Sequence, residues 1–221
     1  RLRDAADSTI ISSPDRLRAV ELDLSRLRMV DLAIHPVAGR FDFLHFTEIH
    51  RRLFSDVFPW AGHQRVGPQT AMIRFAPDAV LFSPADPSAP MTKYTFASGP
   101  EIPEAVSAVF SQLEYLARRT SIERAELLSI MAELGAELFA IHPFRDGNAR
   151  TIWAYGVQLD ESLGMEVDFS QMLAGARLHT KVLPSTYRYQ ATGDFGGYFM
   201  ALDSALSPSE AAARVRDVDA G

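Results

Sequence analysis

Nine consecutive residues, from His142 to Arg150, hold most of the side chains of this chain that could do chemistry together. The run reads His-Pro-Phe-Arg-Asp-Gly-Asn-Ala-Arg. It combines a titratable base, a carboxylate, a Gly-Asn turn and an arginine. These are the groups needed to hold the phosphates of a nucleotide beside a proton acceptor.

The elements on either side of the run should position it. Apolar residues recur at helical spacing and predict a buried helix over residues 124–141; they are Leu127, Ile130, Leu134, Leu138 and Ile141. Pro143 disfavours helical geometry at the preceding His142, so we expect the helix to end there. A second helix is expected after Gly147 and Asn148. The free backbone N–H groups at its N-terminus would form an anion site beside the run.

Each residue then has a chemical role that it could fill. His142, with an ordinary pKa of about 6.5, could accept a proton from an attacking hydroxyl. Asp146 could bind Mg²⁺ together with substrate phosphates, and Arg150 could bind a phosphate through its planar fork. Gly147 lets the backbone approach a phosphate, and Asn148 is expected to cap the second helix or to donate to an oxyanion. The reaction class indicated is transfer of a phosphate-bearing group to a hydroxyl, although the same residues also form a common helix stop and turn.

This run resembles the signature of the Fic family, H-P-F-x-[D/E]-G-N-[G/K]-R-x-x-R. The likeness extends to upstream and downstream residues, which are Phe41, Asp42, Ile49, His50, Leu53, Phe54, Asp56, Val57, Phe58, Trp60, Ala61, Gly62, Arg65, Tyr187, Gly193, Asp194 and Phe195. It covers roughly residues 14–205, with the motifs in the family's order. The resemblance implies a mainly α fold: a helical bundle with the motif loop between two central helices and a β-hairpin flap.

The resemblance also implies an activity, because most characterised Fic proteins transfer AMP from ATP to a Ser, Thr or Tyr hydroxyl of a target protein. It implies His142 as the general base and Asp146 as the ligand of Mg²⁺ or Mn²⁺, with ATP as the donor. The phosphates would be bound by Gly147, Asn148, Ala149 and Arg150. Two alternatives stay open: a transferase that moves UMP, phosphate or phosphocholine, and a non-catalytic binding module on the same fold.

Two positions depart from the signature. Ala149 stands where Gly or Lys is usual, and Trp153 stands where the second arginine would be. In the family that arginine resembles a clamp for the terminal phosphate of ATP, and tryptophan carries no charge. We therefore expect the terminal phosphate to be held less well, which leaves the identity of the donor open.

Residues 66–96 correspond to the flap, since prolines interrupt short apolar runs there and favour a hairpin with a long loop over a helix. We place the end of the flap at Phe96; an alternative alignment places it at Phe75 and Ala76. A target segment would pair with the flap as an added strand. The residues expected to dock it are Lys93, Tyr94, Thr95 and Phe96.

The family also contains an inhibitory helix with the pattern [S/T]-x-x-x-E-[G/N], which has no match in this chain. Ser129 and Ser162 are each followed by a glutamate four residues later, but Leu134 and Val167 then break the pattern. Two readings remain, inhibition by a separate small protein or no inhibition of this kind.

Composition and length limit the classes of protein to which this chain could belong. With 221 residues, 47% of them hydrophobic, the chain is long enough for one Fic domain over residues 1–205, followed by a peripheral tail over 206–221. The net charge of −6 argues against nucleic-acid binding, and no apolar run is long enough to predict a membrane segment. The absence of cysteine fits a cytoplasmic protein. Because the chain begins with Arg1, it could also be part of a larger effector that is delivered to a host cell.

Overall fold

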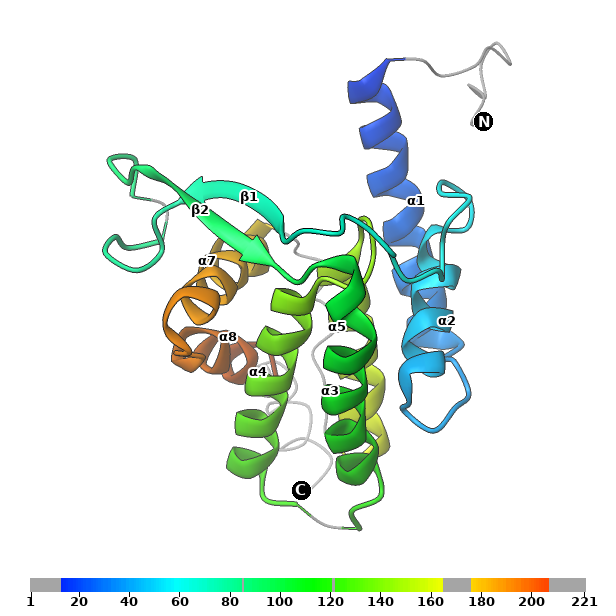
Figure 1. The fold of residues 1–221 in the computed structure, drawn as a ribbon. Coiled ribbons are helices and arrows are strands. Elements are labelled where there is room, and N and C mark those ends of the chain that lie inside the picture. The colour runs from blue at the N-terminus through cyan, green and yellow to red at the C-terminus, as the bar shows by residue number, and fades with distance from the viewer. Residues whose placement is uncertain (1–12, 85, 121, 165–175, 207–221) are drawn as a thin grey trace, which may run out of the picture.

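The computed structural model describes residues 13–84, 86–120, 122–164 and 176–206, and this part of the chain is mostly helical (Figure 1). The helices are α1 (Pro14–Ile34), α2 (Phe43–Phe54), α3 (Ile102–Ala117), α4 (Arg124–Ile141), α5 (Asn148–Ser162), α7 (Ala176–Thr192) and α8 (Gly196–Leu206). A short 3-10 turn, η1 (Gly99–Glu101), precedes α3. The prediction of a mainly α fold is confirmed, while the tail from residue 207 lies outside the described residues.

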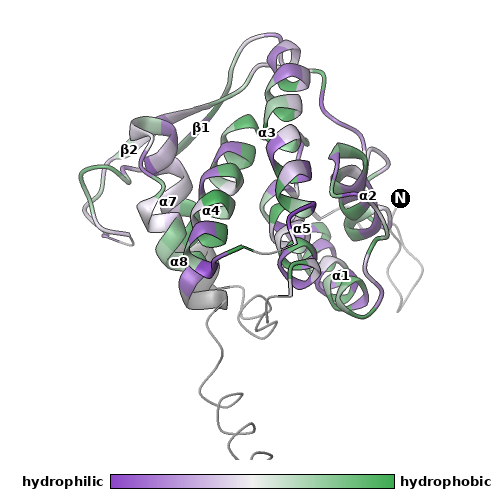
Figure 2. Cartoon of the chain, turned by 90° about the horizontal axis from the view of Figure 1, so that it is seen from below, coloured by the Kyte–Doolittle hydropathy of each residue, from purple (hydrophilic) through white to green (hydrophobic). Residues whose placement is uncertain are grey.

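Helix α4 is the centre of the bundle, because α3, α5, α7 and α8 all contact it. Ten of its residues are buried, including Leu127, Leu134 and Phe139, and they lie on more than one face of the helix. Polar and apolar residues occur on α4 as well as on the helices around it (Figure 2). A helix that is buried on more than one face belongs in the core of a bundle.

Helix α2 begins where its sequence provides a cap. The side chain of Asp42 accepts a hydrogen bond of 2.9 Å from the backbone N–H of His45, which satisfies one of the free donors of the first turn. Phe46, Ile49 and Leu53 are fully buried along one side of the helix. This side packs against α5, so α2 forms one wall of the loop between α4 and α5.

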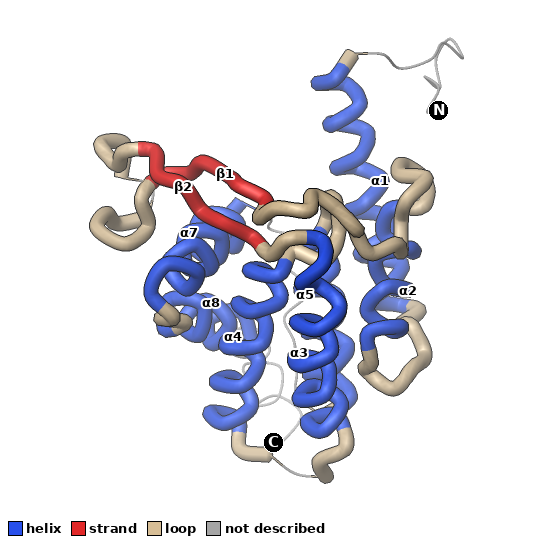
Figure 3. The backbone as a smooth tube through the Cα atoms, viewed as in Figure 1, coloured by secondary structure: helices blue, strands red, loops and turns tan. Residues whose placement is uncertain are grey.

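Strands β1 (Met72–Pro77) and β2 (Met91–Phe96) form an antiparallel hairpin, in which Met72 pairs with Phe96. The hairpin lies across the ends of the helices and extends beyond them (Figure 3). Strand β2 ends at Phe96, where the sequence placed the end of the flap, whereas Phe75, the alternative end, lies inside β1.

The connection between the two strands is held against the domain. The hydroxyl of Tyr94 accepts a hydrogen bond of 2.8 Å from the backbone N–H of Ala79. Arg188 of α7 donates a bond of 3.0 Å to the carbonyl of Val80. These bonds tie the start of the connection to β2 and to α7.

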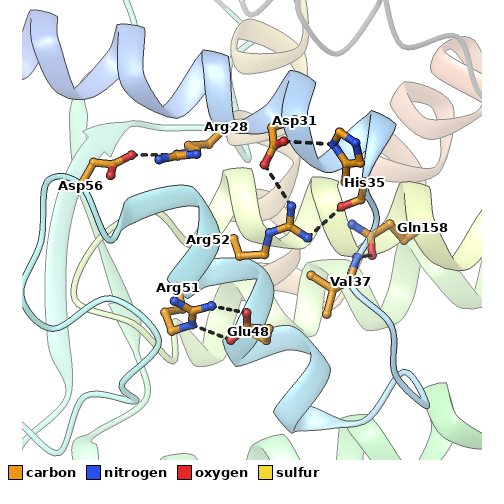
Figure 4. A network of polar contacts seen from close by, with 9 residues as sticks. All are labelled: Arg28, Asp31, His35, Val37, Glu48, Arg51, Arg52, Asp56 and Gln158. Carbon is orange, nitrogen blue, oxygen red and sulfur yellow. Dashed lines mark hydrogen bonds and ion pairs between the residues drawn. The ribbon is translucent and has the colours of Figure 1, made fainter.

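Helix α1 packs on α2 through polar contacts more than through apolar burial. Its buried residues are Glu21, Ser25, Met29 and Leu32. Arg28 is paired with Asp56 at 2.7 Å, and Arg52 of α2 bridges Asp31 at 2.9 Å and the carbonyl of His35 at 2.7 Å (Figure 4). None of the helices in the described part of the chain is both long and apolar enough to cross a membrane.

Candidate active site

His142 is the residue at which α4 ends, and its backbone is left-handed, with φ 54° and ψ 62°. This conformation is uncommon for a residue other than glycine. Its ring lies between Phe96 of the hairpin, with centroids 4.4 Å apart, and Phe139 of α4, at 5.6 Å. The side chain is therefore enclosed, and the residue is only 7% exposed.

The contact of the imidazole with a backbone carbonyl favours one tautomer. Nδ1 lies 3.4 Å from the carbonyl oxygen of Phe139. Because a carbonyl can only accept, Nδ1 carries the proton and Nε2 keeps its lone pair. No described residue donates a hydrogen bond to Nε2, so this nitrogen is the basic atom of the site.

Burial lowers the pKa of His142 to about 4, and the positive charge of Arg74 on β1 adds to the effect. The imidazole is therefore neutral at pH 7 and can accept a proton without first losing one. The ordinary pKa of about 6.5 does not hold in the folded protein, because Phe96 of the hairpin and Phe139 enclose the ring.

The loop from residue 142 to 148 is held in shape by Asn148. Its side-chain Oδ1 accepts a bond of 2.8 Å from the backbone N–H of Phe144, and its Nδ2 donates a bond of 2.9 Å to the carbonyl of the same residue. The residue that caps α5 is Gly147, so the expectation that Asn148 is the cap was wrong. The amide of Asn148 supports the loop, and its contribution to an anion site would come from its backbone N–H.

Gly147 is required by both conformation and space. Its φ is +78°, and a Cβ atom there would lie 2.4 Å from the ring of Phe54. No side chain caps α5, so the N–H groups of its first turn, at residues 148–150, have no acceptor within the helix. Such free N–H groups are the kind of donors that an anion site at this end of α5 would need.

Asp146 is exposed beside this helix end, and its Oδ1 accepts a bond of 2.6 Å from the N–H of Gly147. Its other oxygen makes no hydrogen bond to a described residue. Among the described residues no group of three or more His, Asp or Glu could hold a metal ion alone. A single carboxylate next to a phosphate site is nevertheless how Mg²⁺ is usually bound, since the phosphates supply further ligands.

Arg150 is engaged by α1, which the sequence did not predict. Its Nη1 donates to the carboxylate of Glu21 and, at 2.6 Å, to the hydroxyl of Ser25. The guanidinium also lies 4.6 Å from the ring centre of Phe54. Arg150 therefore lies at the junction of α1, α2 and α5, and its Nε and Nη2 make no bond to a described residue.

The two positions that depart from the signature lie on the core side of α5. Ala149 and Trp153 are partly buried and pack against the hydrophobic core. The Trp153 ring meets Tyr198 of α8 edge-on, with centroids 6.5 Å apart. Trp153 therefore serves the packing between α5 and α8.

A further residue, His50 of α2, packs against the loop and bonds its backbone. Its Nε2 donates a bond of 3.1 Å to the backbone carbonyl of Asp146, and its Nδ1 accepts a bond of 2.8 Å from the N–H of Gly62. The ring stacks on Phe144 at 3.8 Å. Burial lowers the pKa of His50 to about 4, so the ring is neutral and can donate and accept at once.

The expected docking residues of the flap divide between its two faces. Tyr94 and Phe96 are 3% and 1% exposed, and Tyr94 stacks on Tyr187 of α7 at 4.4 Å. Lys93 and Thr95 point to the other face and are exposed. Only the side chains of Lys93 and Thr95 are thus at the surface.

Comparison with known proteins decides the family. Residues 40–159, which include the flap, the loop and most of α5, match the model of the Fic/DOC family. The chain belongs to the Fic/DOC family. The resemblance expected from the motif is thereby confirmed.

Two curated relatives of this Fic domain are named as adenylyltransferases. It is 27% identical over 162 residues to protein adenylyltransferase VbhT of Bartonella schoenbuchensis, which covers 73% of this chain and 30% of VbhT. It is 31% identical over 139 residues to probable protein adenylyltransferase y4lH of Sinorhizobium fredii, which covers 61% of this chain and 60% of that protein. The chain thus spans less than two thirds of either relative.

Solved structures agree on the fold. BepC, a VirB-translocated effector of Bartonella tribocorum with bound AMPPNP, has a TM-score of 0.69 at 22% identity and covers 90% of each chain. The N-terminal Fic domain of a VirB-translocated effector of Bartonella quintana with bound ADP has a TM-score of 0.64 at 20% identity and covers 92% of this chain and 90% of that chain. At these identities the likeness concerns the arrangement of the helices and the hairpin.

Proposed function

We propose that this Fic domain transfers AMP from ATP to a Ser, Thr or Tyr hydroxyl of a target protein. The observation that carries the proposal is the pairing of a neutral imidazole, with Nε2 free to accept a proton, and a helix N-terminus without a side-chain cap that begins six residues later in the same loop. The curated adenylyltransferase relatives support the choice of AMP as the transferred group.

The reaction would begin with transfer of a proton from the target hydroxyl to the base, His142. His142 Nε2 takes the proton of the target hydroxyl while its oxygen attacks the α-phosphorus of ATP. A new P–O bond forms to the target, the bond between the α-phosphorus and the bridging oxygen breaks, and pyrophosphate leaves with the electron pair. The proton then passes from His142 to solvent or to the leaving group. A base with a low pKa is always unprotonated at neutral pH, so positioning and charge stabilisation must supply most of the rate enhancement.

The phosphates would lie at the start of α5. Its free N–H groups, at Asn148, Ala149 and Arg150, are directed out of the helix end, and Gly147 allows close approach. Asp146 would hold Mg²⁺ or Mn²⁺, which neutralises phosphate charge when bound. Arg150 would bind an inner phosphate with the part of its guanidinium that Glu21 and Ser25 leave free.

The target would lie along the hairpin. We assign the flap to residues 66–96 and the Fic domain to residues 1–205, with Lys93 and Thr95 offering the exposed side chains for docking. The backbone of Tyr94 and Phe96 would set the register of the target, while their side chains hold the hairpin to the bundle. The VirB-translocated relatives further support delivery into a host cell as part of a larger effector.

Intact-mass analysis tests the proposal. The protein is incubated with Mg²⁺, a candidate target lysate and separately labelled ATP, UTP and CDP-choline. We expect an AMP adduct that disappears in His142→Ala and persists in His63→Ala, which changes an exposed histidine outside the loop. An adduct that persists in His142→Ala would refute the assignment of the base.

One observation favours a second candidate, a transferase with another donor. Trp153 packs against Tyr198 and supplies no charge for a terminal phosphate. The same experiment separates the candidates, because each donor leaves an adduct of different mass. A UMP, phosphate or phosphocholine adduct in place of AMP would select the second candidate.

A further inference from the structure

Arg65 lies in the segment that leads into the flap, and it is the buried arginine beside the site, only 4% exposed. Its guanidinium donates four hydrogen bonds, all to backbone carbonyls. The acceptors are His142 at 2.6 Å, Ile141 at 3.0 Å, Ala97 at 2.6 Å and Gly67 at 3.0 Å. Neither the motif nor the geometry of the phosphate site gives this side chain a role.

Two of these acceptors belong to the end of α4. The last carbonyls of a helix have no donor within the helix and carry its negative partial charge, so a cation is favourable there. Arg65 satisfies the carbonyls of Ile141 and His142 at the point where Pro143 prevents the helix from continuing. No ion pair joins Arg65 to a described carboxylate, so these carbonyls are the groups that compensate its buried charge.

The other two acceptors lie at the two ends of the flap. Gly67 precedes β1 and Ala97 follows β2, so one guanidinium joins both ends of the hairpin. Backbone bonds reinforce the junction: the N–H of Arg65 donates to the carbonyl of Pro143 at 2.9 Å, and the N–H of Gly99 donates to that of Pro68 at 2.7 Å. The end of α4 and the base of the flap thus meet at Arg65.

We propose that Arg65 is a positioning residue that sets the distance between the base His142 and the hairpin that would hold the target. The proposal rests on the function proposed above, because the distance between His142 and the hairpin affects the rate only if the hairpin holds the target. A planar guanidinium with five donors can hold carbonyls from three separate segments in fixed directions. Lysine keeps the charge but has a compact head, and it cannot reproduce that geometry.

The charge of Arg65 also affects the pKa of His142, which can be measured independently of the reaction rate. The charged groups that act on His142 are Arg74 of β1 and Arg65, which lower its pKa, and Asp146, which raises it. Loss of the positive charge of Arg65 must therefore raise the pKa of His142. Lysine keeps the positive charge, so Arg65→Lys should leave this contribution to the pKa of His142 in place.

The test compares Arg65→Lys and Arg65→Gln with Arg52→Gln. Arg52 is a matched control, since it also bonds a backbone carbonyl and is partly buried, but it lies between α1 and α2. We expect Arg65→Lys to lower kcat by roughly ten- to a hundredfold with little change in KM for ATP, because small misplacements of reacting groups cost about that much. Arg65→Gln should lower kcat similarly and also move the acid limb of the pH profile to higher pH. Arg52→Gln should change neither kcat nor the acid limb; because Arg52 helps to attach α1, which holds Arg150, its one expected effect is a higher KM for ATP.

A measurement without activity separates this proposal from the proposed function. In Arg65→Gln the ring of His142, followed by NMR, should titrate at higher pH than in the wild type. The amides of Ala97 and Gly99 should exchange with solvent at least tenfold faster, and in Arg65→Lys the exchange should rise without the titration shift. If the wild type transfers nothing, these two readouts still decide whether Arg65 holds the junction. If Arg65→Gln does not fold, Arg65→Lys decides alone. Wild-type kcat and wild-type exchange in Arg65→Lys would overturn the proposal.

Discussion

The neutral, buried state of His142 should make the stability of this protein depend on pH. An unfolded histidine has a pKa of about 6.5, whereas that of His142 in the folded protein is about 4. Between these values the unfolded chain binds a proton that the folded chain does not bind. The stability contributed by the neutral ring is therefore complete above about pH 6.5 and is lost as the pH falls toward about 4.

The size of the effect follows from the same two values. Over the whole window His142 accounts for about 3 kcal/mol of unfolding free energy, and somewhat less than half of it is already lost at pH 5.5. Carboxylates add their own dependence below about pH 5. The interval from pH 7.5 to 5.5 avoids the carboxylates, but His50, whose pKa is also about 4, contributes there, so His142 is isolated only by comparison with a variant that lacks it.

The assay is urea unfolding of the wild type and of His142→Gln at pH 7.5 and 5.5. Glutamine does not titrate, so the difference in unfolding free energy between the two proteins should shift by about 1 kcal/mol in favour of the variant at the lower pH. His63→Gln, which replaces an exposed histidine, is the control and should leave the dependence of the wild type unchanged.

Two results would refute the reasoning. A constant difference between wild type and His142→Gln across the interval would mean that the folded ring protonates as easily as the unfolded one. An NMR titration of the His142 ring with its midpoint near neutrality would mean the same. Either result would show that the contacts with Phe96 and Phe139 do not exclude water from the ring.

Three further outcomes are expected. Gly147→Ala should lower stability by about 2–4 kcal/mol in denaturant unfolding, because it combines a left-handed backbone with a clash against Phe54, whereas Gly193→Ala, with φ +75° and no atom within 4 Å, should cost only about 1 kcal/mol. In calorimetry Asp146→Ala should abolish the gain in ATP affinity that Mg²⁺ gives the wild type, while affinity in excess chelator stays the same. Because Trp153 carries no charge, the wild type should bind ADP within about tenfold of ATP; a hundredfold preference for ATP, the size of a charged hydrogen bond to phosphate, would show that another residue clamps the terminal phosphate.

Local patterns predicted the elements well. The spacing of Leu127, Leu134 and Leu138 gave α4, Pro143 gave its end, and the prolines after Arg65 gave the hairpin with its end at Phe96. Each of these signals acts within a few residues of the element that it describes. Helix periodicity and proline sterics are local, so they can be read without knowledge of the fold.

The contacts that shape the site could not be read in this way. Arg65 bonds His142 across 77 positions of sequence, and Glu21 bonds Arg150 across 129. Neither pair has a spacing that a motif could reveal. The pKa of His142 depends on a ring from the flap and on Arg74, so it also required the three-dimensional arrangement.

The polar contacts between α1 and α2 should make the attachment of α1 sensitive to the salt concentration of the buffer. Exposed ion pairs such as Arg28 with Asp56 weaken with added salt, since the Debye length falls to about 3 Å at 1 M, while buried apolar contacts strengthen. The core around α4 should therefore tolerate high ionic strength better than the attachment of α1. Limited proteolysis in rising salt should cut within α1 first, and nucleotide affinity should change in parallel, because the same helix holds Arg150 through Glu21 and Ser25.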